Sequence, residues 1–193
     1  MSRLLRKRFA VLKRFAREKR GATAVEFALI SIPFMMLLFG VLEIGMLLLV
    51  SATLDTAVEF AARNVRTGEF QQGGAVDAGS FKGLVCRNMT WLESSCLNSD
   101  RVVVEAETFD NFTDLGTSNP ADPLTFDPDA RCWSVGGPKD IVVMRVYYQW
   151  DLLTPLLNSS LENMGNDRRM IVSSTAFRNE PYDPNIDKVG AGC

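Results

Sequence analysis

The chain has 193 residues, of which 47% are hydrophobic and 23% are charged, values that an ordinary soluble protein also shows. It contains no histidine, which excludes Ser-His-Asp and Cys-His catalysis and every histidine metal site. The formal net charge of −2 hides an asymmetry. Residues 1–20 carry nine Lys/Arg and one acid, whereas the rest of the chain has a net charge of −10. We therefore expect the two parts to meet different surroundings.

The basic segment 1–20 also carries apolar residues at three- and four-residue steps, among them Leu5, Phe9 and Leu12. This pattern favours a basic amphipathic helix on an anionic membrane surface. A nucleic-acid-binding arm is the alternative, since basic N-terminal arms also bind phosphates. The segment that follows favours the membrane.

A long apolar segment begins at Phe27, has no charge as far as Leu42, and continues after Glu43 to Val50. A membrane-spanning helix needs about 20 apolar residues, so we predict a span over about 27–50. The basic flank predicts a cytoplasmic N-terminus and a C-terminal part outside. No clear small-residue cleavage site follows the segment, which disfavours a secretory signal peptide.

Two residues of this segment differ in chemistry from their neighbours. Because a charge in lipid is costly, we expect Glu43 to lie at the outer membrane interface rather than in a buried pairing role. Pro33 frees a helix carbonyl and predicts a kink. Membrane helices tolerate such a proline, and local melting on leaving the bilayer is the functional alternative.

The helical pattern continues beyond the apolar segment. Four apolar residues share one helix face: Leu54, Val58, Ala61 and Val65. Gly68 suits a C-terminal cap. We therefore predict one helix from Ala22 to Thr67, within a helical region 22–68 whose first half crosses the membrane and whose second half packs on a domain.

Residues 69–193 are predicted to form a small α+β head domain outside the membrane. A Gly-rich linker precedes a short helix near residues 80–93, with Ser80 as its N-cap. Segments rich in Val, Ile, Thr and aromatic residues predict three strands of a short antiparallel sheet: 101–109, 140–150 and 169–177. The long loop 110–139 is either functional or structured in a way the sequence does not show.

Four cysteines follow the apolar segment: Cys86, Cys96, Cys132 and Cys193. An even number on the side predicted to be outside supports two disulfides, with three pairings to choose from. We favour Cys86–Cys96, which closes a short loop, and Cys132–Cys193, which ties the long loop to the tail. A Cys₄ zinc site is the alternative, but it lacks a Cys-x₂₋₄-Cys pair. We expect no metal and no other cofactor.

The junction between the basic and apolar segments carries the main functional signal. A basic stretch ends at Gly21, and Glu26 lies just inside the apolar segment. If the chain were cut after Gly21, Ala22 would bear a new α-amino group and Glu26 would be the fifth residue of the mature chain. These two charges would then pair between neighbouring subunits in a poorly solvated place.

This junction resembles the class III signal of type IV pilins and pseudopilins, most closely the tight-adherence (Tad, or Flp) subfamily. In that family the prepilin peptidase cuts after a Gly, and Glu followed by Tyr or Phe occupies mature positions five and six. Gly21, Glu26 and Phe27 match this pattern. The wider stretch is similar to TadE-like proteins, with the run Gly-Ala-x-Ala-Val-Glu-Phe-Ala, then Pro33 and Glu43.

The resemblance implies a pilin-like fold and a minor pilin or pseudopilin, cut after Gly21, that helps to assemble an adhesive pilus. The implied partners are the membrane, a prepilin peptidase, other pilins and an inner-membrane assembly platform, without nucleic acid. The implied location is a single pass through the inner membrane, with the head periplasmic or extracellular.

Two alternatives need no processing: a bitopic envelope scaffold or binding protein, and an envelope enzyme. No G-x-S-x-G, S-x-x-K or P-loop motif is present. We therefore expect no enzymatic activity.

Overall fold

The computed structural model describes residues 21–74, 76–154 and 158–182, so the basic leader lies outside the described residues. The chain forms two compact units that divide between Leu42 and Glu43. We call the unit from Glu43 onward the head unit. Helix α2 (Ala22–Arg66) has 45 residues and runs through this division. The prediction of one continuous helix is confirmed to within a residue at its C-terminal end.

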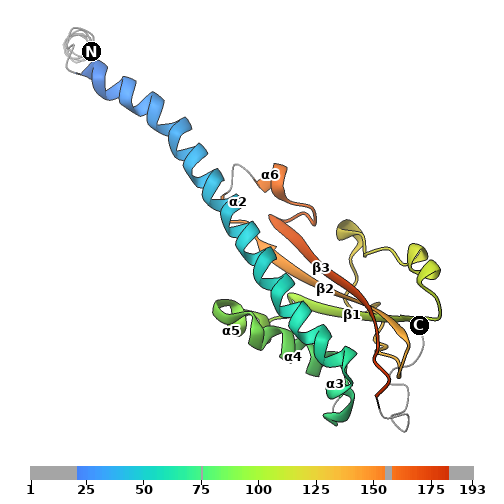
Figure 1. The fold of residues 1–193 in the computed structure, drawn as a ribbon. Helices are drawn as coiled ribbons and strands as arrows, with labels where there is room; N and C mark the ends of the chain where they lie inside the picture. The colour runs from blue at the N-terminus through green and yellow to red at the C-terminus, as the bar shows by residue number, and fades with distance from the viewer. Residues whose placement is uncertain (1–20, 75, 155–157, 183–193) are drawn as a thin grey trace, which may run out of the picture. The chain divides into compact units, whose positions relative to one another are not determined.

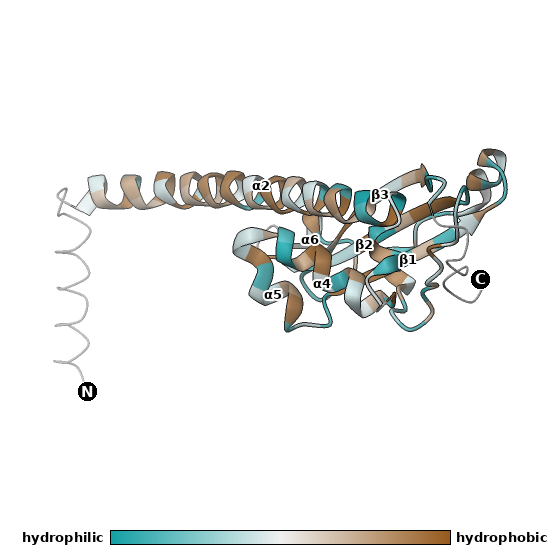
Figure 2. Ribbon diagram, turned by 60° about the horizontal axis from the view of Figure 1, so that its bottom comes forward, coloured by the Kyte–Doolittle hydropathy of each residue, from teal (hydrophilic) through white to brown (hydrophobic). Residues whose placement is uncertain are grey.

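The first unit presents the apolar part of α2, and its side chains are largely exposed. Figure 2 shows hydrophobic residues along this part of the helix, where Phe27 is 74% exposed and Leu37 is 66% exposed. By length and composition α2 can cross a membrane. An apolar surface of this extent needs lipid or other apolar helices around it.

The head unit contains a three-stranded antiparallel sheet in the order β1-β2-β3. The strands are β1 (Val102–Phe109), β2 (Ile141–Asp151) and β3 (Arg168–Arg178). Each lies within one residue of the predicted bounds at both ends, so the predicted α+β class is confirmed. The shorter elements are α3 (Glu69–Gln72), α4 (Ala78–Asn88), η2 (Thr90–Leu92), α5 (Glu93–Leu97), η3 (Phe112–Thr117), η4 (Pro123–Thr125) and α6 (Asn158–Leu161).

The core of the head unit lies between one face of the sheet and the helices α2 and α4 (Figure 1). The four apolar residues predicted to share a face of α2 are at most 1% exposed. They pack in one cluster with Phe81 and Val85 of α4 and with sheet residues such as Met144. Burial of each Leu, Val, Phe or Met side chain in this cluster stabilises the fold by about 1.5–3 kcal/mol, which explains why this half of α2 stays on the sheet.

Helix α4 begins one turn earlier than predicted, and the N-cap assignment was wrong. Asp77 is the cap, and its carboxylate accepts a hydrogen bond from the backbone N–H of Ser80 at 2.7 Å. Ser80 therefore occupies the third helical position instead of the cap. A carboxylate at a helix N-terminus also interacts favourably with the helix dipole, which favours Asp77 over a serine three residues later.

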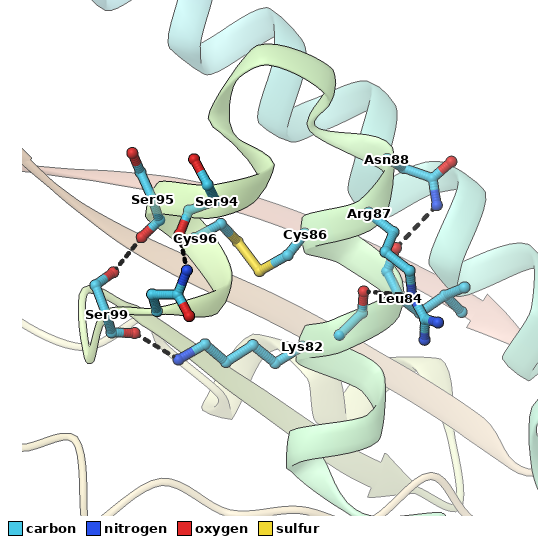
Figure 3. Close-up of a disulfide and its surroundings, with 11 residues drawn as sticks. Lys82, Leu84, Cys86, Arg87, Asn88, Ser94, Ser95, Cys96 and Ser99 are labelled. Carbon is cyan, nitrogen blue, oxygen red and sulfur yellow. Dashed lines mark hydrogen bonds between the residues drawn. A yellow bond between two sulfur atoms is a disulfide. The ribbon is translucent and has the colours of Figure 1, made fainter.

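The Cys86–Cys96 disulfide is confirmed, and it joins α4 to α5 (Figure 3). In the same hairpin, Lys82 donates a hydrogen bond from Nζ to the backbone oxygen of Ser99 at 2.7 Å. Cys132 is also disulfide-bonded. Its predicted partner, Cys193, lies outside the described residues.

The segment 110–139 is structured, which answers the question left open by the sequence. Residues at its end pair with β1, since Ala106 N–H donates to the oxygen of Cys132 and Ser134 N–H donates to the oxygen of Ala106. Trp133 packs against Phe81 with ring centroids 5.3 Å apart. The segment therefore covers part of the outer edge of β1 and joins the helical side of the core.

Candidate functional site

The predicted processing residues lie at the start of α2. The helix begins at Ala22, directly after Gly21, and both residues are exposed. A Cβ added to Gly21 would meet no other atom within 4 Å. Glu26 follows Ala22 by four residues, so the two share a helix face one turn apart. Glu26 and Phe27 are both exposed, so these residues are open to a partner.

Pro33 lies inside α2, where its ring nitrogen cannot donate to the carbonyl of Leu29. Nearby, the hydroxyl of Ser31 donates to the oxygen of Ala28 at 3.1 Å, a side-chain bond that competes with the helix ladder. This turn of α2 is therefore held by fewer backbone hydrogen bonds than its neighbours. The kink assigned to Pro33 stays a prediction.

Glu43 is the first residue of the head unit, and its side chain is only 3% exposed. Its two carboxylate oxygens each lie 3.1 Å from the backbone N–H of Leu153, and Oε2 also accepts the hydroxyl of Thr154 at 2.9 Å. The expectation that Glu43 is not buried was therefore wrong, whereas its position at the outer membrane interface stays a prediction. Donors from a segment 110 residues away satisfy it, and its sequence neighbours carry no sign of them.

A buried charged cluster occupies the sheet face opposite the helices. Its members are Glu105, Glu107, Arg131, Arg145 and Tyr147. Glu105 is 4% exposed and accepts the hydroxyl of Tyr147 at 2.6 Å. Arg145 lies 3.4 Å from Glu105 and 3.3 Å from Glu107. Two carboxylates and two guanidinium groups balance, so the cluster needs no external ion to be neutral.

The charged cluster fixes the segment 110–139 to the sheet. Arg145 donates from Nη2 to the backbone oxygen of Ser118 at 2.8 Å, and the N–H of Ala121 donates to the hydroxyl of Tyr147 at 3.2 Å. The ring of Phe126 lies 5.1 Å from that of Tyr147. Sequence reasoning missed this cluster. Its signal was the placing of charges at alternate strand positions, which puts them on one face.

The environment of Tyr147 suppresses its ionisation. Burial raises its pKa to about 12, and the hydrogen bond to Glu105 adds to the rise. A phenolate at this place would face a carboxylate without solvent. The hydroxyl is therefore a structural donor in the neutral form, and nothing in its surroundings suits it to act as a base.

A second polar cluster ties the end of the described chain to the end of α2. Asn179 is 3% exposed and donates to the oxygens of Val135 and Gly137. Gln71 and Asn179 both donate to the hydroxyl of Tyr182, at 3.1 and 3.3 Å. These residues join α3, the turn before β2 and the chain after β3, residues 178–182.

Gly68 follows α2 with φ +81°, as predicted for a C-terminal cap. The ring of Tyr182 lies against it, so that an added Cβ would stand 2.5 Å from the ring carbon Cγ. Only glycine fits both the backbone conformation and this contact. Gly68 is thus fixed by the same cluster that holds residues 179–182.

The described head unit has an open groove of about 680 Å³ that is lined by residues of α2 and β3, and also by Glu180. Arg66 and Glu180 form an ion pair at 3.4 Å, and both side chains are about half exposed. The described residues hold no group of three or more metal-binding His, Cys, Asp or Glu side chains.

Comparison with known proteins identifies one segment. Residues 21–63 match the family model described as TadE-like protein. No curated protein and no solved structure matches the chain. The matched segment contains Gly21, Glu26, Phe27 and Pro33, and it extends to the part of α2 that packs on the head core.

Proposed function

We propose that this chain is a minor pilin or pseudopilin of the tight-adherence pilus system, inserted in the inner membrane by α2 and processed after Gly21. Its TadE-like segment supports a pilin-like protein associated with that pilus. The observation that carries the proposal is the match over residues 21–63 together with the exposed apolar surface of α2.

The anchor accounts for the composition of the first unit. From Ala22 to Leu42 the helix is largely apolar and largely exposed, with Glu26 as its one charge. In the bilayer these side chains meet lipid, and in a filament they meet the helices of other pilins. The basic segment 1–20 keeps the N-terminus in the cytoplasm, where a prepilin peptidase would reach Gly21.

Removal of residues 1–21 changes the charge of the helix end. The leader carries +8, and the remaining chain carries −10. After cleavage the helix begins with the α-amino group of Ala22, and Glu26 lies one turn along the same face. The Glu26 carboxylate would pair with the α-amino group of a neighbouring subunit, so that neither charge stays alone in an apolar place.

The test is intact-mass analysis of the full chain made with and without a prepilin peptidase. We expect loss of residues 1–21 and an N-terminal Ala22 only in the presence of the peptidase. Gly21→Val should abolish this loss. The change leaves the fold intact, because a Cβ at Gly21 meets open space. Gly45→Val is the matched control, since a Cβ there also meets nothing within 4 Å.

Two results contradict the proposal. Intact Met1 on the wild-type chain in the presence of active peptidase would exclude processing and favour an envelope scaffold or binding protein. Equal maturation of wild type and Gly21→Val would show that cleavage occurs at another place.

A further inference from the structure

The apolar surface of α2 does not end where the head unit begins. On the side away from the head core, Ile44 is 48% exposed and Leu48 is 66% exposed. The first exposed charge after Glu43 is Asp55. It follows Glu43 by twelve residues, or about 18 Å at 1.5 Å per residue. Glu43 therefore lies well inside the apolar part of the helix.

The segment bound to Glu43 is apolar as well. Residues 152–157 read Leu-Leu-Thr-Pro-Leu-Leu and carry no charge. Leu152 is buried, whereas the side chain of Leu153 is 69% exposed. The backbone N–H of Leu153 lies 3.1 Å from both Glu43 carboxylate oxygens. An exposed leucine thus lies beside a helix surface that is itself exposed and apolar.

We propose that the segment 152–154 is a second membrane contact of the head unit, in which Leu153 enters the interfacial zone of a phospholipid bilayer beside α2. This inference rests on the proposed function of α2 as an anchor. A span of about 20 residues counted from Phe27 ends beyond Glu43, so lipid surrounds the helix at that position.

The same geometry explains the buried carboxylate. A charge at this depth is costly unless polar groups surround it. No ion pair joins Glu43 to a Lys or Arg of the described chain. The N–H of Leu153 and the hydroxyl of Thr154 satisfy it instead. The segment therefore presents donors to the helix while its leucine side chain faces the lipid.

Exposure alone does not identify such a contact, because single exposed leucines are common on soluble proteins. Leu124, in η4, is 75% exposed and provides the comparison. It lies in the segment 110–139 that covers the other face of the sheet. Leu153 differs from Leu124 because it lies beside Glu43, which is inside the apolar part of α2.

The test uses the full chain, with its native disulfides oxidised, in vesicles of phosphatidylethanolamine and phosphatidylglycerol. Single cysteines are introduced as Leu153→Cys, Leu124→Cys and Leu37→Cys and labelled with an environment-sensitive fluorophore. In one set of vesicles a fraction of the lipids carries a nitroxide quencher on the acyl chain near the headgroup, and in a second set the quencher lies near the end of the acyl chain. We expect a large loss of fluorescence at position 153 with the quencher near the headgroup, a large loss at position 37 with the quencher near the chain end, and little loss at position 124 with either.

The three positions separate this inference from the proposed anchor. Quenching at 37 without quenching at 153 would overturn the second membrane contact and leave the anchor standing. Absence of quenching at 37 would overturn the anchor itself and, with it, this inference. Equal quenching at 124 and 153 would also overturn it, since the head unit would then touch lipid without preference for this segment.

Discussion

Gly68→Ala is the substitution whose cost follows most directly from the structure. Alanine would have to adopt φ +81°, a left-handed conformation that costs about 1–2 kcal/mol in residues other than glycine. Its Cβ would stand 2.5 Å from Cγ of Tyr182, so the ring must move. The hydroxyl of that ring accepts hydrogen bonds from Gln71 and Asn179, each worth about 1 kcal/mol.

The sum is a loss of about 3–4 kcal/mol in the free energy of unfolding, or more if the moved ring leaves an empty space. Gly74→Ala is the matched control. Gly74 has φ +87°, but a Cβ there meets nothing within 4 Å. The Gly74→Ala variant should therefore lose only the cost of the left-handed backbone conformation, about 1–2 kcal/mol of the free energy of unfolding. Both substitutions reduce the entropy of the unfolded chain equally, so that effect cancels in the comparison.

Urea unfolding of the full chain in detergent micelles measures both costs. Tryptophan fluorescence reports the transition, because Trp133 packs in the aromatic group with Phe70 and Phe81. A double-mutant cycle with Tyr182→Ala isolates the contact. In that background Gly68→Ala should cost no more than Gly74→Ala. The same large cost of Gly68→Ala with and without the Tyr182 ring would refute the reasoning.

Two further predictions concern the charged cluster. Arg145→Met removes the partner of two partly or fully buried carboxylates and should lower the free energy of unfolding by about 3–5 kcal/mol. Arg101→Met breaks an ion pair with Asp151 whose side chains are about half exposed, and should cost no more than about 1 kcal/mol. Equal costs in urea titrations would contradict the assignment of the cluster as buried. The pKa of Tyr147, raised to about 12, makes stability depend on alkaline pH. The neutral Tyr147 hydroxyl contributes fully to the free energy of unfolding below the unfolded-state pKa near 10. This contribution is lost as pH rises towards 12, and the total loss is on the order of 2–3 kcal/mol. The Tyr147→Phe variant should lose less stability than the wild type between these pH values. Parallel plots of the free energy of unfolding against pH for the two proteins would contradict the raised pKa of Tyr147.

The sequence by itself determined the features that depend on local pattern. The apolar run and its basic flank predict the long helix, and the face containing Leu54 and Val58 was assigned from spacing alone. The strand bounds were predicted from runs of β-branched and aromatic residues, because the preference for a strand is set by the composition and alternation of a few neighbouring residues. The junction at Gly21 and Glu26 was likewise readable, since its chemistry lies in eight consecutive residues.

Only the tertiary structure decided which distant residues meet. Glu43 is buried because Leu153 and Thr154 supply donors. The segment 110–139 is fixed to the sheet because Arg145, which pairs with Glu105 across two strands, also donates to the backbone oxygen of Ser118. Gly68 is constrained by Tyr182 as well as by its own cap position. These contacts join residues 27 to 114 positions apart. Sequence spacing constrains neighbours within a helix turn or a strand, whereas long-range partners depend on how the elements pack.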